Sequence, residues 1–181
     1  MLSELAKPGS VEPTLLNTAV TVAAHGGDAA LYEKYLARSR SASDPEEHYR
    51  YMYALASFSD PVLVRRTMDY ILSPEVRSQD AKVFIARLLG NRDAQAFAWQ
   101  LLQERWNDVQ KKTGEFVGNT VIVGALGSFC DARTLAQVRQ FFGAHKVPDA
   151  ERTLQQAIER INACVARSAA QSPKLAAWLN R

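Results

Sequence analysis

The chain has 181 residues, of which 47% are hydrophobic and 23% charged, and its formal net charge is +3. This composition excludes a disordered tail, a collagen-like repeat and a small disulfide-rich scaffold. The small net charge does not by itself indicate a nucleic-acid or anionic-lipid partner, which usually requires a concentrated basic patch. The length predicts one domain with a sizeable core.

The beginning of the chain shows no targeting or membrane segment. Its first nine residues lack the apolar stretch of a signal peptide, and no apolar run approaches the roughly 18 residues that a membrane-spanning helix needs. We therefore expect a soluble, cytoplasmic chain without membrane insertion. Residues 1–12 are expected to form an N-terminal extension, and residues 13–181 a single helical-repeat domain.

In chain order, the predicted helices alternate between two kinds, and the first kind starts at an aspartate. Asp28, Asp60, Asp93 and Asp131 recur every 32 to 38 residues, and each precedes apolar side chains at i, i+3/i+4, i+7 spacing. An aspartate at the N-cap accepts hydrogen bonds from the free N–H groups of the first turn, and Pro61 suits the first helical position. We therefore predict a helix after each of these aspartates.

The second kind consists of partner helices in the intervening segments. They are expected at residues 12–24, 44–58, 78–89 and 114–129, and two more helices are expected at 149–168 and 173–180. The β-branched run 120–123 is interpreted as buried helix, because glycines and polar residues flank it at helical spacing. No segment shows strict two-residue alternation between hairpin turns, so the predicted fold class is all-α.

A helix pair that recurs every 33 to 40 residues or so is typical of an α-solenoid of stacked antiparallel helix pairs. Each pair buries its apolar face against its neighbours, and the stack curves, which leaves a concave face for extended ligands. The repeats resemble one another only weakly, so a non-repetitive helical bundle remains an alternative.

The sequence carries none of the common catalytic motifs. It lacks HExxH, a P-loop, a GxGxxG after a strand and a GxSxG elbow. The histidines, His25, His48 and His145, lie far apart, whereas a catalytic zinc ion needs three converging ligands. We predict no catalytic residue and no metal site.

The cysteines and the central tryptophans are interpreted as structural. Cys130 and Cys164 form no CxxC pair and have no cationic neighbour on the same face, so we expect buried, inert thiols. Trp99 and Trp106 are seven residues apart and can share one helical stripe. Core packing is the preferred interpretation over a stacking platform for bases.

The basic residues are scattered, and most have carboxylates nearby, which indicates a solvated surface. Arg77, Arg87 and Arg92 differ because they flank predicted helix junctions. An arginine that faces the concavity could bind a carboxylate through two parallel hydrogen bonds. These three arginines are therefore candidates for substrate contact.

Several segments together resemble a known family. They are YALASF (53–58), DP (60–61), RT (66–67), LSPEVRSQD (72–80), AWQLLQERWN (98–107) and QQAIERI (155–161). In this order and spacing they resemble the C-terminal helical domain of aminopeptidase N-type zinc metallopeptidases, which include puromycin-sensitive and endoplasmic-reticulum aminopeptidases. The resemblance covers residues 15–179. One departure is Arg167, which replaces a tryptophan common in relatives and predicts altered packing of the last two helices.

The resemblance implies a stack of HEAT/armadillo-like helix pairs that closes over a catalytic domain and forms an internal chamber. The zinc motif of the family lies in an upstream domain and is absent here, so zinc is expected only in that domain. The implied partners are the catalytic domain of the parent aminopeptidase and its peptide substrates, which lose residues from their N-termini. This chain alone should be inactive.

The resemblance also places two turns, next to Asn91 and Ser128, on the chamber side, which makes Ser128 a fourth substrate-contact candidate. Relatives that anchor a peptide C-terminus use basic residues near the first turn, where this chain has Gly90. The neighbouring Arg87 and Arg92 could substitute for them.

Two other functions would also fit a helical-repeat domain. A freestanding helical-repeat scaffold for a protein partner remains an alternative, which predicts a terminal helix with a polar outer face. A nucleic-acid-binding repeat would require Lys and Arg along one face, and the scattered charges argue against it.

Overall fold

The computed structural model describes residues 9–114 and 117–180, with side chains from residue 119 in the second range. Within these residues it contains ten α-helices, three 3₁₀ helices and no strand, so the all-α prediction is confirmed. The α-helices are α2 (Pro13–His25), α3 (Ala29–Ser41), α4 (Pro45–Ala54), α5 (Pro61–Leu72), α6 (Ser78–Gly90), α7 (Gln95–Glu104), α8 (Trp106–Thr113), α9 (Val117–Ala125), α10 (Ala132–Ala144) and α11 (Glu151–Leu179). The 3₁₀ helices are η1 (Leu55–Ser57), η2 (Leu126–Ser128) and η3 (Pro148–Ala150).

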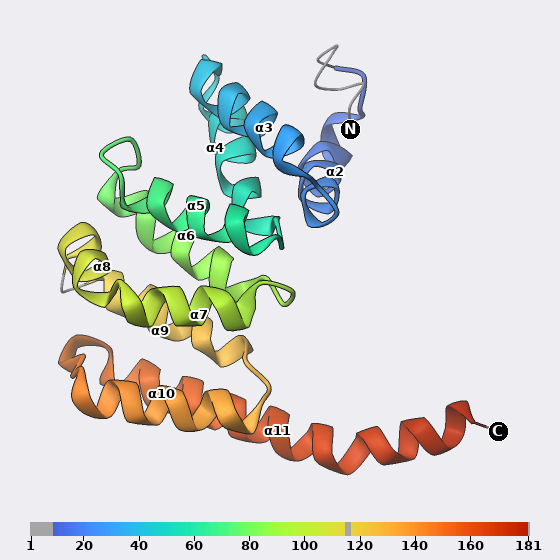
Figure 1. Cartoon of the computed structure of the whole chain (residues 1–181), viewed down its shortest axis with the longest axis vertical. Coiled ribbons are helices and arrows are strands. Elements are labelled where there is room, and N and C mark those ends of the chain that lie inside the picture. Colours follow the sequence, from blue (N-terminus) through green and yellow to red (C-terminus); the bar gives the residue numbers. More distant parts are fainter. Residues whose placement is uncertain (1–8, 115–116, 181) are drawn as a thin grey trace.

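The helices lie in successive layers along the longest axis of the molecule (Figure 1). The first layer holds α2, α3 and α4, and it is followed by α5 with α6, by α7, α8 and α9, and by α10 with α11. Helices α2 and α4 contact each other, η1 connects α4 to α6, and α6, α9 and α11 contact one another in series. This row of inner contacts holds successive layers together.

The aspartate caps explain where α3, α4, α5 and α10 begin. Asp28 accepts a hydrogen bond from the Leu31 N–H at 2.9 Å, and Asp60 accepts from two N–H groups at the start of α5. Asp131 caps α10 in the same way, and Asp44 caps α4. These bonds satisfy donors that have no partner inside the helix.

Asp93 does not cap α7, and this prediction was wrong. The N-cap of α7 is Ala94, whose backbone dihedrals (φ −100°, ψ −8°) are close to helical. Its N–H bonds to the Asn91 carbonyl at 3.1 Å, so Asp93 lies inside a tight turn that continues from α6. A capping side chain requires an extended N-cap backbone, which this turn does not provide.

The final two predicted helices are a single helix, and this boundary was also wrong. Helix α11 runs from Glu151 to Leu179 with Pro173 in its interior. Proline removes one backbone hydrogen bond, but the surrounding turns of α11 are exposed, so the carbonyl it leaves free can bond to water. The helix-forming Lys-Leu-Ala-Ala that follows also favours continuation. Arg167 is exposed on this helix, and its guanidinium lies 4.0 Å from the Cys164 sulfur.

The β-branched run is helical, as predicted. Ile122 and Val123 on α9 are fully buried. The expected start at Gly114 was too early, because Gly114 has a left-handed φ of 73° and ends α8. Residues 115 and 116 of the predicted helix lie outside the described residues.

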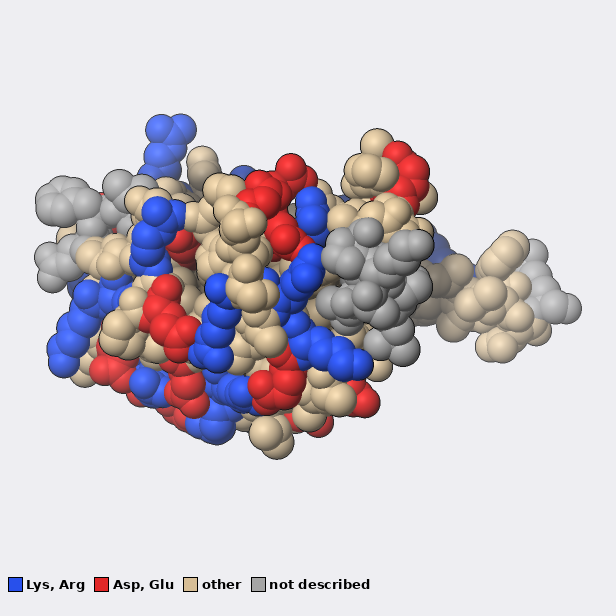
Figure 2. All heavy atoms as spheres, turned by 90° about the horizontal axis from the view of Figure 1, so that it is seen from above, with Lys and Arg blue, Asp and Glu red and all other residues tan. Residues whose placement is uncertain are grey.

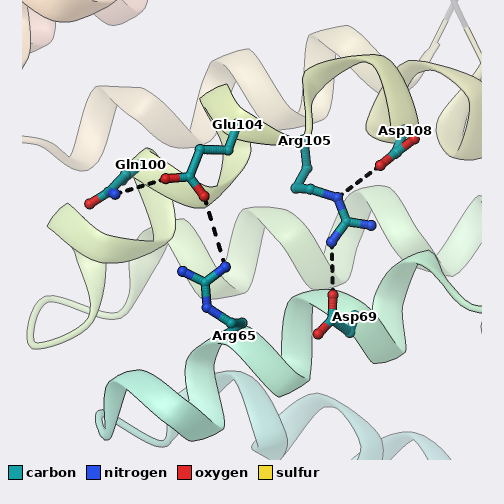
Figure 3. A network of polar contacts seen from close by, with 6 residues as sticks. All are labelled: Arg65, Asp69, Gln100, Glu104, Arg105 and Asp108. Carbon is teal, nitrogen blue, oxygen red and sulfur yellow. Dashed lines mark hydrogen bonds and ion pairs between the residues drawn. The ribbon is translucent and has the colours of Figure 1, made fainter.

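Polar side chains pair across the layers at the break between α7 and α8 (Figure 3). The Arg105 guanidinium donates to Asp108 at 2.8 Å and to Asp69 of α5 at 2.8 Å. Arg65 of α5 lies 3.9 Å from Glu104, at the end of α7. The helix predicted to run on to Trp106 is interrupted at Arg105, whose side chain joins two layers instead.

The aromatic residues form the core between the last two layers, as predicted. Trp99 is 2% exposed and its ring contacts Phe129, Phe141 and Phe142. Trp106 also packs on Phe141, with ring centroids 5.5 Å apart. These contacts join α7 and α8 to α10.

The cysteines are joined, so the prediction of inert free thiols was wrong. Cys130, in the turn before α10, forms a disulfide with Cys164 of α11, and their Cα atoms are 5.2 Å apart. They are 34 residues apart in the chain, and the α10–α11 hairpin brings them together. The bond ties the last helix to the start of its layer.

Candidate functional site

A polar cleft lies on helices α2, α4 and α6. Its volume is about 600 Å³. The lining residues are Asn17, Thr21, Glu46, Tyr49, Arg50, Tyr53, Ala54, Asp80 and Arg87. We call it the α2–α4–α6 cleft. Figure 2 shows that acidic and basic side chains lie interspersed on the face of the molecule that is seen from above.

One wall of the cleft is held by Arg50, which joins α4 to α2. Its guanidinium donates to Asn17 of α2 at 2.7 Å and to Glu46 at 2.7 Å. Its side chain is 13% exposed, so these bonds fix its position. Arg50 therefore shapes the cleft rather than presenting a free cation.

Two stacked tyrosines form the floor. The rings of Tyr49 and Tyr53 are nearly parallel, with centroids 5.6 Å apart. The Tyr49 hydroxyl donates to Asp80 at 3.4 Å. Burial raises the pKa of Tyr53, and the negative charge of Asp80 raises it further. Tyr53 is therefore a neutral phenol near pH 7, and both tyrosines line the cleft.

Arg87 also lines this cleft, and it has no carboxylate partner among the described residues. Its guanidinium carbon lies 4.6 Å from the centre of the Tyr53 ring. The ring orients the guanidinium plane by a cation–π contact, and its N–H donors remain available. Such a group can bind a carboxylate or a peptide carbonyl.

Arg77 lies beside the cleft and is already paired. It donates to Asp80 at 2.9 Å and also to the Tyr49 hydroxyl. It lines a smaller cleft of about 370 Å³ that shares Tyr49 and Asp80 with the first. The structure therefore places the predicted Arg77 and Arg87 on adjoining clefts.

The other two candidates lie elsewhere. Arg92 is exposed in the turn between α6 and α7 and lines neither cleft. The Ser128 hydroxyl donates to the Ala125 carbonyl at 2.8 Å and accepts from Gln95 at 3.0 Å. The first of these bonds lies at the end of α9, and the second joins this end to α7, so the Ser128 hydroxyl has a structural role.

Sequence reasoning missed the tyrosines and Arg50 as site residues. Their signal was the i, i+4 spacing of Tyr49 with Tyr53 and of Glu46 with Arg50, which places each pair on one helical face. That spacing does not reveal that Asn17 and Asp80, from two other helices, complete the same cleft.

In the described part of the chain, no three His, Cys, Asp or Glu side chains gather where they could hold a metal ion. The helices found there are all too short or too polar to cross a membrane. The cellular compartment stays a prediction.

Comparisons with known proteins identify relatives over most of the chain. The family described as "ERAP1-like C-terminal domain" matches residues 2–163. Aminopeptidase M1 of Arabidopsis thaliana is 31% identical over 145 residues, which cover 80% of this chain and 16% of that protein. Alanine/arginine aminopeptidase of Saccharomyces cerevisiae is 28% identical over 173 residues, which cover 93% of this chain and 19% of the relative.

A rice protein, aminopeptidase M1-B, is 30% identical over 169 residues, which cover 89% of this chain and 18% of the relative. The chain thus spans less than a fifth of the length of these curated relatives. Since the family match extends over most of the sequence, the chain belongs to the ERAP1-like C-terminal domain family of the M1 aminopeptidases.

Proposed function

We propose that this chain is the non-catalytic C-terminal domain of a zinc-dependent aminopeptidase. In this role it closes the substrate chamber and contacts the distal part of a peptide whose N-terminal residues are removed. The family match carries the proposal. The zinc ion and the catalytic residues would belong to an upstream domain, which is also the first partner that we propose for this chain.

The same proposal includes the shape of the stack. We propose a curved, HEAT/armadillo-like solenoid in which α2, α4, α6, α9 and α11 line the concave, chamber-facing side. The serial contacts among these helices support this arrangement, because helices that form one inner row must touch across the layers. The α2–α4–α6 cleft would then open into the chamber.

Within that cleft, Arg87 is the proposed peptide contact and Arg77 a positioning residue. Arg87 has guanidinium donors without a partner among the described residues, whereas Arg77 holds Tyr49 and Asp80 in place. A peptide carboxylate or carbonyl at the cleft would meet Arg87 and the two tyrosine hydroxyls. Arg92 and Ser128 remain weaker candidates, since neither lines the cleft.

The test combines this chain with the remaining portion of its parent enzyme. We expect no hydrolysis of aminoacyl-anilides by the chain alone, and restored trimming of peptides of about ten residues or more on mixing. In the combined enzyme, Arg87→Ala should raise KM for long peptides about tenfold, which corresponds to about 1.4 kcal/mol. The KM for aminoacyl-anilides should not change.

Arg133→Ala is the matched control, because it also removes an exposed arginine but lies on α10, outside the cleft. Hydrolysis by the isolated chain would contradict the non-catalytic role. An unchanged KM for long peptides in Arg87→Ala would contradict the assignment of the cleft. Failure of the chain to associate with the catalytic portion would favour the freestanding scaffold instead.

A further inference from the structure

A second groove lies at the other end of the molecule, between the C-terminal half of α10 and the first turns of α11. Its volume is about 610 Å³. Its floor includes the apolar side chains of Phe142, Val147, Leu154 and Ile158, and its rim carries Arg139 and Lys146. We call it the end groove.

The end groove faces away from the preceding layer. On α10, Phe141 and the buried Phe142 both pack against Trp99 and Trp106 of that layer. On α11, Ala157 lies against Gly127 of η2. A helix turns by about 100° per residue, so the groove-lining positions 139 and 143 on α10 point away from Phe141, and positions 151, 155 and 158 on α11 lie at least 100° around the helix from Ala157.

This orientation has a consequence for what can fill the groove. In a stack of helix pairs, the outer side of the last pair is the place where a further helix would pack. The groove between two neighbouring helices accepts a helix whose apolar side chains recur at i, i+3, i+4 and i+7. The geometry therefore favours a helical occupant.

The charged residues that line the groove indicate the charge of the helix that it would bind. Two of the lining residues, Arg139 and Lys146, are basic. Within the part of the chain that the structure describes, neither Arg139 nor Lys146 forms an ion pair or a side-chain hydrogen bond. Glu151 is the acidic residue of the lining.

We propose that the end groove binds an acidic amphipathic helix of a partner protein. The apolar face of that helix would cover the half-buried Leu154 and Ile158, and its carboxylates would pair with Arg139 and Lys146. A second copy of this chain is a poor occupant, since a symmetric contact through this face would bring the same cations together. The proposal does not depend on the aminopeptidase role.

The test uses the full chain and a fluorescein-labelled 16-residue peptide with leucines at i, i+3, i+4 and i+7 and glutamates on the flanking positions. Fluorescence anisotropy at 0.15 M salt should show saturable 1:1 binding. The double variant Arg139→Glu/Lys146→Glu should weaken binding at least tenfold. Leu154→Gln, at a half-buried position on the floor, should weaken it severalfold without a charge change.

The matched control is Arg133→Glu/Arg152→Glu, which makes the same charge change at exposed positions outside the lining. Circular dichroism checks that every variant is folded. Absence of saturable binding overturns the proposal, and so does equal weakening by the control pair, which would indicate non-specific attraction. A concentration-dependent dimer that the groove variants abolish would identify a second copy as the occupant.

Discussion

Charged side chains behave differently in the first layers and in the last one. Arginines of α3, α5 and the α7–α8 break form pairs that reach across layers, as Arg66 does with Glu33 and Arg40 with Glu75. In the last layer, Arg139 and Lys146 have no such partner among the described residues, and a disulfide joins the turn before α10 to the middle of α11. These cross-layer pairs need carboxylates on a neighbouring layer, and in the described structure the last layer has such a neighbour on one side only.

The largest expected effect comes from breaking the core that joins these two regions. Trp99→Ala should lower the free energy of unfolding by about 3–5 kcal/mol, because the cavity would remove contacts with three phenylalanines at once. Urea denaturation, followed by circular dichroism, measures the change. Trp178→Ala is the matched control, since Trp178 is 66% exposed and its loss should cost less than about 0.5 kcal/mol. Equal losses in the two variants would contradict the placement of Trp99 in the core.

The next largest loss of stability is expected when the disulfide of the last layer is removed. Cys130→Ser/Cys164→Ser should lower the free energy of unfolding by about 3–4 kcal/mol in oxidising buffer, because the open loop restores chain entropy to the unfolded state. The same unfolding experiment with a reductant should lower the stability of the parent chain to that of the variant. A parent chain that does not respond to the reductant would show that the crosslink contributes nothing.

A smaller effect separates the true N-cap from the mistaken one. Asp131→Ala should cost about 1 kcal/mol, since two backbone donors lose their acceptor, while Asp93→Ala should change stability by less than about 0.5 kcal/mol. Equal losses of stability in the two variants would indicate that Asp93 also acts as an N-cap.

Asp131 also predicts a pH dependence. A hydrogen bond from the Thr134 side chain, together with the backbone donors of the first turn, lowers the pKa of Asp131. The ionised Asp131 carboxylate therefore contributes fully to the free energy of unfolding above the pKa of about 4 that it has in the unfolded chain. This contribution is lost as the pH falls towards the lower pKa that it has in the folded chain. Thermal unfolding between pH 6 and pH 3 should show a shallower loss of stability in Asp131→Ala than in the parent chain.

The smallest change in stability is expected when a paired arginine is removed, and an unpaired arginine provides the comparison. Arg105→Ala removes two carboxylate contacts that are partly exposed, and should cost about 0.5–1 kcal/mol at low salt and less at high salt. Arg139→Ala removes no contact of this kind and should leave the unfolding midpoint unchanged. A similar loss in both variants would mean that the cross-layer pairing of Figure 3 adds nothing to stability.

The sequence predicted those features that depend on local chemistry. The aspartates that cap α3, α4, α5 and α10 are followed by apolar residues at helical spacing, so their role could be read along the chain. Asp93 has the same local pattern, but a tight turn leading out of α6 decides its geometry. Pro173 was predicted to start a helix, yet the exposure of α11 at that point tolerates the missing bond.

The site residues required tertiary packing to be found. Arg87 was predicted from its place near a helix end, but its orientation depends on Tyr53, which lies 34 positions earlier on another helix. Arg92 satisfied the same criterion and lines neither of the two clefts described above. The pairing of Cys130 with Cys164 likewise follows from how α10 and α11 fold back on each other, and spacing alone does not encode it.

The covalent link between the turn before α10 and the middle of α11 changes how this end of the molecule responds to tension. If the chain were pulled from its C-terminus, the exposed turns beyond Cys164 could extend, but force would then pass to Cys130 and bypass α10. Helix α10 would thus be shielded inside a closed ring while the layers before it take up the load.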